Sequence, residues 1–143
     1  MQIVIRNLQD KKIPVKAKRV KSAILRVLKS CDIKKSAKIG IYFVDNKKIQ
    51  ELNLRYLNKN YPTDVLAFDI SRDRDQLYAD IFVSVDMAIY NARLFKTLLS
   101  YELYLYIIHG MLHLMGYDDK TPRQRKIMRK KERQLLRLPN LLK

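Results

Sequence analysis

The segment from Tyr101 to Met115 is apolar on every side of a helix, and this feature constrains the fold more than any other. A surface helix is apolar along one stripe only, so a helix of this kind packs in the interior and the rest of the chain must surround it. The chain has 143 residues, of which 48% are hydrophobic, which is enough for one core and too little for two ordinary domains. We therefore expect a single domain, residues 1–143, built around this helix.

Strand and helix patterns alternate along the rest of the chain. Four short β-branched runs predict strands at 2–6, 38–44, 65–70 and 78–83. Apolar residues at helical spacing predict helices at 16–30, 46–57 and 85–92. Asp45 or Asn46 is expected to cap the second of these helices, and Ser84 the third. The order β-α-β-α-β-β-α-α-α, with no repeat or linker, predicts one α+β unit.

The end of the buried helix and the start of a last helix are both marked in the sequence. Gly116 is a natural stop for the buried helix. Thr121, Pro122 and Gln124 then supply a hydroxyl cap, a first-turn proline and a side chain that can return the hydrogen bond. We expect a strongly basic helix from this point to about Leu138.

Basic side chains outnumber acidic ones by 30 to 14, and the excess lies at the two ends of the chain. Residues 1–38 carry twelve basic and two acidic side chains, and 120–142 carry nine and one, whereas 39–119 carry eight and eleven. Terminal helices that hold a phosphate backbone while the middle carries the chemistry would produce this distribution. A solvated, lysine-rich surface and an acidic membrane partner are the alternatives.

Other features lead us to expect a cytoplasmic protein. The longest uninterrupted apolar run, 103–108, is far shorter than the roughly 18 residues of a membrane-spanning helix, so no membrane partner of that kind is expected. The N-terminal segment lacks the pattern of a secretion signal, and the single Cys31 cannot form an internal disulfide.

Both histidines of the chain lie one helical turn apart near the end of the buried helix. His109 and His113 therefore project from the same face and are close enough to share one metal ion, although hydrogen-bonded core histidines are the alternative. Gly116 lets the chain double back, so that Asp119 can supply a third ligand. The spacing H-x-x-x-H-x-x-G-x-x-D matches the metzincin signature, but Gly110 stands where that signature has its catalytic Glu, which disfavours a metalloprotease.

This ligand set favours a hydrolytic zinc site. Imidazole and carboxylate ligands suit Zn²⁺, with Ni²⁺, Mn²⁺ and Fe²⁺ left open by ligand type. Three protein ligands leave one position for water, as catalysis by zinc requires. We expect one Zn²⁺ per chain, with catalysis acting through that water and with no protein general base identified.

Three segments resemble YbeY-type proteins, which are metal-dependent endoribonucleases of ribosomal RNA maturation. HGMLHLMGYDD resembles the signature HGxLHLxGYDH, LNLRYLNKNYPTDVLAF resembles LNxxYRxxxxPTDVLSF, and ADIFVS resembles GDIxIS, which together span about 52–119. The resemblance implies a zincin-like, single α+β domain with a four-stranded mixed β-sheet packed against helices and the metal site at the end of the buried helix. It also implies zinc-dependent cleavage of single-stranded RNA, small-subunit rRNA 3′-end maturation, ribosome quality control, and association with the ribosomal small subunit and its proteins.

Two departures from the YbeY pattern bear on activity. Asp119 stands where the family has its third histidine, and a carboxylate neutralises part of the ion's charge, so slower hydrolysis or a preference for a harder metal is expected. Leu57 stands where the family has an arginine expected to face the scissile phosphate; Arg55 or Lys59 could substitute, and neither is assigned. A non-catalytic, RNA-binding ribosome-assembly factor that uses metal mainly for stability is therefore the alternative function.

Further residues are candidates around this site. By resemblance, Thr63 and Asp64 border the active-site cleft, with a turn cap as the alternative. Glu102, two turns before His109, could orient an imidazole or form a salt bridge with a basic helix. Basic side chains of the last helix are expected to contact RNA: Lys120, Arg123, Arg125, Lys126, Arg129 and Lys130. Three tyrosines could stack on unpaired bases or simply pack: Tyr56, Tyr61 and Tyr117.

Overall fold

The computed structural model describes residues 1–136, which form four strands and five helices. In chain order the elements are β1 (Gln2–Asn7), α1 (Ala17–Ser30), β2 (Ser36–Val44), α2 (Asn46–Leu57), β3 (Val65–Asp69), β4 (Gln76–Ser84), α3 (Val85–Phe95), α4 (Leu99–Leu114) and α5 (Pro122–Leu136). This order confirms the predicted one. The expected end of the last helix near Leu138 lies outside the described residues.

The four strands form one mixed sheet in the order β1-β2-β4-β3. β1 pairs with β2 and β2 pairs with β4 in parallel, whereas β3 pairs with β4 antiparallel. The polar connection between β3 and β4 is a hairpin, as its length predicts. The mixed four-stranded sheet and the α+β class are therefore confirmed.

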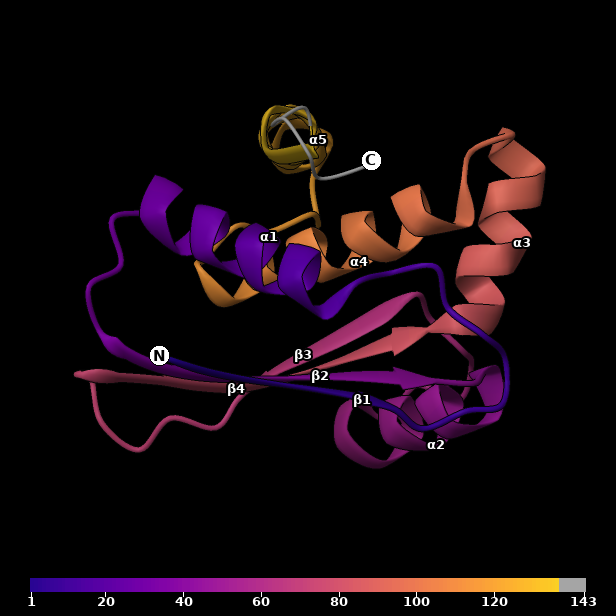
Figure 1. Cartoon of the computed structure of the whole chain (residues 1–143), viewed down its shortest axis with the longest axis horizontal. Helices are drawn as coiled ribbons and strands as arrows, with labels where there is room; N and C mark the ends of the chain where they lie inside the picture. The colour runs from indigo at the N-terminus through magenta and orange to yellow at the C-terminus, as the bar shows by residue number, and fades with distance from the viewer. Residues whose placement is uncertain (137–143) are drawn as a thin grey trace.

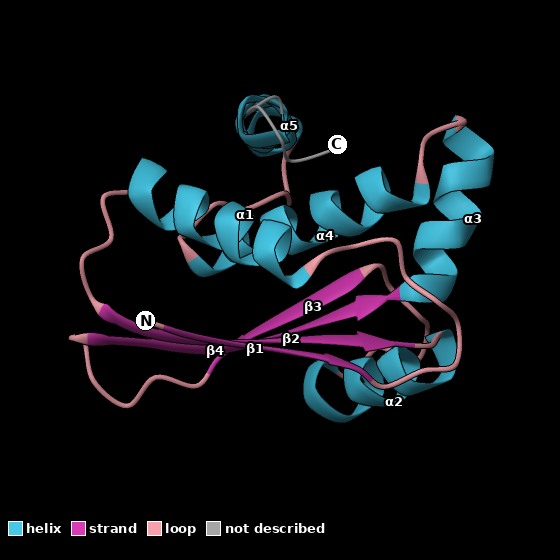
Figure 2. Cartoon of the chain, viewed as in Figure 1, coloured by secondary structure: helices cyan, strands magenta, loops and turns pink. Residues whose placement is uncertain are grey.

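Helices cover both faces of the sheet and form layers on one side of it. α1 and α4 lie on one face, α2 packs on part of the opposite face, and α3 stands beside the ends of the strands (Figure 1). α5 packs on α4 and α1, on the side away from the strands (Figure 2). Alternate residues of the central strands, such as Ile39, Ile41 and Phe43 on β2, point toward α1 and α4 and are fully buried.

α4 is the central helix of the molecule, as its apolar surface predicts. It packs against α1, α3, α5, β3 and β4, and its residues Leu103, Ile107 and Leu112 have no solvent exposure. Gly110 lets α4 approach the sheet closely, because a Cβ at this position would lie 3.2 Å from side-chain methyl groups of Val65 and Ile81. A side chain at this position would require these neighbours to shift by a few tenths of an ångström.

No helix in the described part of the chain combines the length and the apolar character needed to span a membrane.

Candidate metal centre

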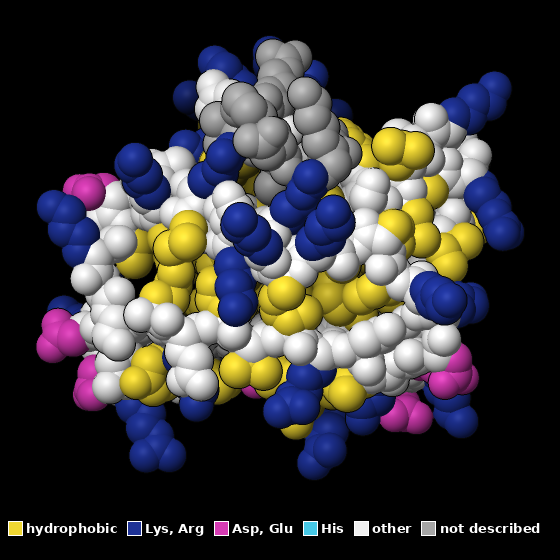
Figure 3. Space-filling view, in the orientation of Figure 1, with side chains coloured by type: hydrophobic (Ala, Val, Ile, Leu, Met, Phe, Trp, Pro, Cys, Tyr) yellow, Lys and Arg dark blue, Asp and Glu magenta, His cyan; other side chains and the backbone are white. Residues whose placement is uncertain are grey.

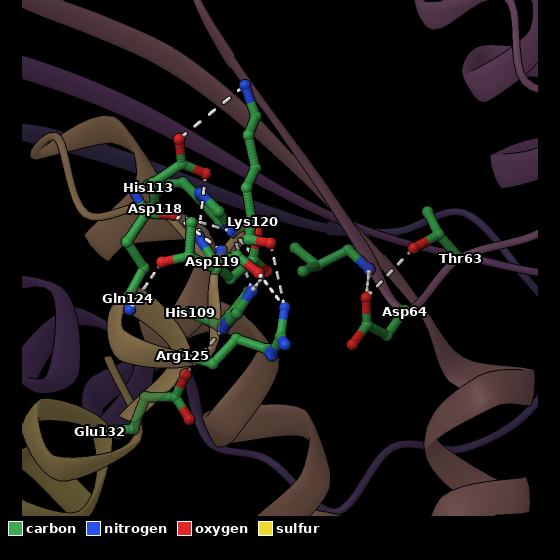
Figure 4. A network of polar contacts seen from close by, with 12 residues as sticks. Thr63, Asp64, His109, His113, Asp118, Asp119, Lys120, Gln124, Arg125 and Glu132 are labelled. Carbon is green, nitrogen blue, oxygen red and sulfur yellow. Dashed lines mark hydrogen bonds and ion pairs between the residues drawn. The ribbon is translucent and has the colours of Figure 1, made fainter. Parts of the chain in front are cut away.

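Three side chains at the C-terminal end of α4 bring their ligand atoms together. Nε2 of His109 lies 3.0 Å from Nε2 of His113 and 3.3 Å from Oδ2 of Asp119, and the third distance, from His113 to Asp119, is 3.4 Å. Figure 4 shows the two rings and the carboxylate converging on one point. Nε2 of each ring faces the other ring and the carboxylate of Asp119, which is the arrangement that a shared ion requires.

The geometry of this cluster fits a divalent metal ion. A tetrahedral zinc ion about 2.0–2.1 Å from each ligand separates the ligand atoms by about 3.3 Å. The three observed distances lie close to that value, and the ligand atoms come from residues that are only partly exposed. His109, His113 and Asp119 could therefore hold one ion while leaving a position open.

Glu132 of α5 orients the first imidazole. Its Oε1 lies 2.7 Å from Nδ1 of His109, and the glutamate is 8% exposed. A hydrogen bond from Nδ1–H to the carboxylate leaves Nε2 with its lone pair directed at the centre of the cluster, which is the arrangement found for metal-binding histidines. This residue was missed by the sequence interpretation, which proposed Glu102 for the role.

Glu102 lies elsewhere, and the expectation that it orients an imidazole is wrong. It is buried in the first turn of α4, where Oε2 accepts a hydrogen bond of 2.9 Å from the hydroxyl of Thr97. The partner of His109 comes instead from a helix 23 residues further along the chain.

The electrostatics of the site favour positive charge. Burial is the largest single effect on the pKa of His109, and it lowers this pKa. The hydrogen bond and the charge of Glu132 act in the opposite direction, as do the charges of Asp64 and Asp119. Together these carboxylates raise the pKa of His109 above its ordinary value. Carboxylates that attract a proton on the imidazole also attract a cation placed at the same point. The site is therefore an anionic pocket in a strongly basic protein.

The turn that carries Asp119 is built from a helix stop and a helix start. Gly116 has a φ of 100°, and the N–H groups of Gly116 and Tyr117 donate to the carbonyls of His113 and Leu112, which is a Schellman ending. Nη1 of Arg125 donates to the carbonyl oxygens of Asp119 and Lys120, at 3.2 and 3.1 Å. The turn is thereby fixed at both ends.

The predicted capping box at the start of α5 is confirmed. The hydroxyl of Thr121 accepts from the N–H of Gln124 at 3.1 Å, and the side chain of Gln124 accepts from the N–H of Thr121 at 3.0 Å. This box starts α5 immediately after the ligand turn, so that Glu132 reaches His109 about two and a half turns later.

Two cavities adjoin the ligand cluster. The first, about 210 Å³, is on the side of His109, and the second, about 320 Å³, is on the side of His113. The first is lined by Asp64, Leu105, Tyr106, His109, Asp119, Arg125, Met128, Arg129 and Glu132. The second is lined by Asn53, Leu57, Lys59, Tyr61, Thr63, Val65, Leu66, Ala67, Gly110 and His113.

The structure places Thr63 and Asp64 at these cavities. Asp64 lines the first and Thr63 lines the second. Oδ1 of Asp64 accepts hydrogen bonds from the N–H of Val65 at 2.8 Å and from the hydroxyl of Thr63 at 3.2 Å, which join adjacent residues and are not the bond to the N–H two residues on that a turn cap makes. Asp64 is a carboxylate of the site that lies outside the ligand cluster.

The lining of the second cavity distinguishes between Arg55 and Lys59, the two cations near Leu57 that the sequence left as alternatives. Lys59 and Leu57 both line it. The guanidinium of Arg55 instead lies 5.5 Å from the ring centre of Tyr56, outside the cavity-lining set. Of these two cations, Lys59 is therefore the one that lines the cavity beside His113.

The three candidate tyrosines fall in different places. Tyr61 lines the second cavity and is 53% exposed. Tyr56 packs its ring against Phe68, with ring centres 5.3 Å apart, and Tyr117 packs against the main hydrophobic core. Of the three, only Tyr61 lines a cavity that also includes a residue of the ligand cluster.

Basic side chains surround the described part of α5. Lys120, Arg123, Lys126, Arg129 and Lys130 are exposed, whereas Arg125 is partly buried by its bonds to the ligand turn. Figure 3 shows Lys and Arg side chains gathered on the face of the molecule where α1 and α5 lie. Arg125 and Arg129 also line the first cavity.

Comparisons with known proteins match most of the chain. The family model described as "Endoribonuclease YbeY" matches residues 4–139. A relative of that description from Syntrophus aciditrophicus is 37% identical over 142 residues, covering 94% of this chain and 88% of the relative. One from Thermoanaerobacter sp. is 31% identical over 157 residues, covering 99% of each chain. A solution structure from Thermotoga maritima has a TM-score of 0.63 and 27% identity, and the match covers 94% of this chain and 87% of that one.

Proposed function

The chain belongs to the YbeY family of endoribonucleases, and from this membership we propose that it is a zinc-dependent enzyme that cleaves single-stranded RNA. We place its action in the maturation of the 3′ end of small-subunit ribosomal RNA and in ribosome quality control, in the cytoplasm, with the small subunit and its proteins as partners. Residues 1–143 would act as a single domain. The YbeY-like segment HGMLHLMGYDD supports these assignments.

The single observation that carries the proposal is the close convergence of the ligand atoms. His109, His113 and Asp119 place two nitrogens and one oxygen within 3.4 Å of one another, which is close to the ligand spacing of a tetrahedral zinc site. The family is metal-dependent, and this donor set accepts zinc.

Each group at the centre then has a part in phosphodiester hydrolysis. A bound zinc ion supplies Lewis acidity and an acidified water molecule. Glu132 keeps the proton of His109 on Nδ1 and so directs Nε2 at the ion. Asp64, which lines the same cavity without being a ligand, is the carboxylate available to accept a proton from the attacking water. Gly110 stands where the metzincin signature has its catalytic Glu, so that position of α4 supplies no general base.

Basic side chains would hold the RNA backbone on either side of the reacting phosphate. Arg129 lines the first cavity, and Lys59 lines the second. Exposed cations of the turn before α5 and of α5 itself extend this surface: Lys120, Arg123, Lys126 and Lys130. The positive surface would steer a polyanion toward the anionic pocket, where a metal ion reverses the local charge.

A cleavage assay tests the proposal. A labelled single-stranded fragment that carries the 3′ end of small-subunit rRNA should be cut by the zinc-loaded protein, and the same fragment in a duplex should not. Chelation, or His113→Ala, should abolish cleavage while RNA binding persists. Binding with no cleavage by the zinc-loaded protein would support the alternative, an RNA-binding assembly factor in which metal serves stability.

A further inference from the structure

The cavity on the His113 side of the metal centre has the size and lining of a small-ligand site. Its volume of about 320 Å³ lies at the lower end of the roughly 300–1,000 Å³ typical of such sites. It is formed between α2, the α2–β3 connection, β3 and α4, and it shares His113 with the ligand cluster. A molecule in this cavity would therefore lie next to whatever reacts at the metal.

A buried amide at the wall of this cavity has an unused hydrogen-bond acceptor. Asn53 is 1% exposed, and its Nδ2 donates to the carbonyl of Tyr61 at 2.9 Å. Its Oδ1 has no hydrogen-bond partner among the described residues. The bond from Nδ2 to Tyr61 holds the α2–β3 connection and fixes the orientation of the Asn53 side chain. Oδ1 is therefore left as an acceptor for an N–H group.

The rest of the lining is of three kinds. Leu57 and Val65 provide apolar walls, Tyr61 provides a half-exposed aromatic ring, and Lys59 provides a cation. An acceptor, an aromatic ring and a cation in one small cavity match the N–H edge, the face and the phosphate of a nucleotide, respectively. A base within a duplex could not enter, because its edge is paired and both of its faces are stacked.

We propose that this cavity, beside His113, binds one unpaired nucleotide of the RNA, adjacent to the phosphodiester that reacts at the metal. The base lies against Tyr61 and donates an edge N–H to Oδ1 of Asn53, and Lys59 contacts its phosphate. This inference rests on the proposed ribonuclease function and gives it a physical basis for single-strand specificity, since the nucleotide must leave its stack to be bound.

The experiment uses nucleotide monomers and the metal-free, full-length protein. In ¹⁵N-resolved NMR titrations, adenosine 5′-monophosphate should shift the backbone amides of Tyr61, Thr63 and Ala67 and the side-chain amide of Asn53. Ribose 5-phosphate, which lacks the base, should shift these signals far less at equal concentration. Purine riboside 5′-monophosphate has no N–H on the corresponding edge and should bind about fivefold more weakly than adenosine 5′-monophosphate.

Matched variants separate the cavity from its surroundings. Tyr61→Ala keeps the backbone carbonyl that holds Asn53, and it should weaken nucleotide binding about tenfold through loss of stacking. Tyr56→Ala removes a tyrosine of similar exposure, 58% against 53%, that packs on Phe68 outside the cavity, and it should leave binding unchanged. Lys59→Ala should weaken nucleotide binding more than Arg55→Ala, because Lys59 lines the cavity and Arg55 lies over the ring of Tyr56 outside it.

Two results would overturn the inference. The first is a set of shifts that is the same for ribose 5-phosphate as for the nucleotide, or that is confined to α5. The second is an equal loss of affinity in Tyr61→Ala and Tyr56→Ala. Either result combined with intact, zinc-dependent cleavage would reject the nucleotide site and keep the ribonuclease function. Shifts in the cavity without any cleavage would keep the site and reject the function.

Discussion

At the scale of single residues, the site depends on one glutamate in a very basic segment. Glu132 is the one acidic side chain among residues 120–142, and it lies on the face of α5 that buries Met128 and Leu135. The signal was present in the sequence, because a carboxylate at an apolar position of a basic helix requires a buried partner. The partner, His109, was not predictable, because the spacing of residues along one helix cannot reveal their contacts with another helix.

Glu132→Gln tests the orienting role of this residue. The amide oxygen of glutamine can still accept from Nδ1–H of His109, but the negative charge is lost, so zinc affinity should fall about 10- to 100-fold. Competition with a chromophoric chelator measures this affinity. Glu51→Gln, on an exposed side chain of α2, is the control and should bind zinc as the wild type does. Equal affinity in all three proteins would refute the role.

Asp119→His tests the effect of the carboxylate ligand. Replacing it with a neutral imidazole leaves more positive charge on the ion, so water at the ion becomes more acidic and the pH of half-maximal cleavage should fall. Relative activity with zinc over manganese should rise, because imidazole is a softer ligand than carboxylate. A pH–rate profile of the two proteins checks this expectation. An unchanged profile would show that Asp119 does not contribute charge to the reaction.

At the scale of elements, local patterns predicted the strands and helices closely. The caps at Asp45 and Ser84 are confirmed, since each side chain accepts from the N–H three residues later. β2 and β4 each begin two residues earlier than expected, at Ser36 and Gln76. These extra residues carry no β-branched pattern, and they extend the strands because the two strands pair with each other along their whole length.

Glu102→Gln tests the ionised group in the first turn of α4. Burial raises the pKa of Glu102 above its ordinary value, the hydrogen bond from Thr97 partly offsets this, and the charge of Asp64 adds to the rise. The folded state therefore binds this proton more tightly than the unfolded state does. Below about pH 4.3 the group is protonated in both states and costs nothing; as pH rises toward and beyond the folded pKa, ionisation destabilises the fold.

The expected result is a difference that grows with pH. Glu102→Gln should match the wild type in free energy of unfolding near pH 4 and exceed it at neutral pH. Urea denaturation at several pH values measures the free energy of unfolding of the wild type and of the variant. Glu51→Gln, on an exposed residue, should show no such trend. A constant difference across pH would mean that Glu102 has the same pKa in the folded and unfolded states.

At the scale of the whole molecule, the sequence predicted the centre of the fold but not how distant parts meet there. The apolar segment 101–115 predicted the central helix α4, and the resemblance to YbeY-type proteins predicted the mixed sheet. The two cavities were not predictable, because they are formed by β3, the α2–β3 connection and α5 around the end of α4. For the same reason the choice of Lys59 over Arg55 required the structure.

Salt dependence tests whether the exposed cations of α5 hold the RNA backbone. Neutralising three of them, Arg123, Lys126 and Lys130, to Gln should weaken binding and reduce the slope of log affinity against log salt by about 2. Fluorescence anisotropy with a single-stranded oligonucleotide measures this slope. Neutralising three exposed cations of the acidic middle of the chain, Lys47, Arg72 and Arg74, is the control. Equal slopes for the two triple variants would remove α5 as the docking surface.

The central claim is that His109, His113 and Asp119 bind one zinc ion, and zinc stoichiometry measures it directly. Metal-free protein titrated with zinc in the presence of a competing chelator should take up one equivalent. His113→Ala should lose most of this uptake while keeping its far-ultraviolet circular dichroism. Uptake of one equivalent by both proteins, or by neither, would contradict the account.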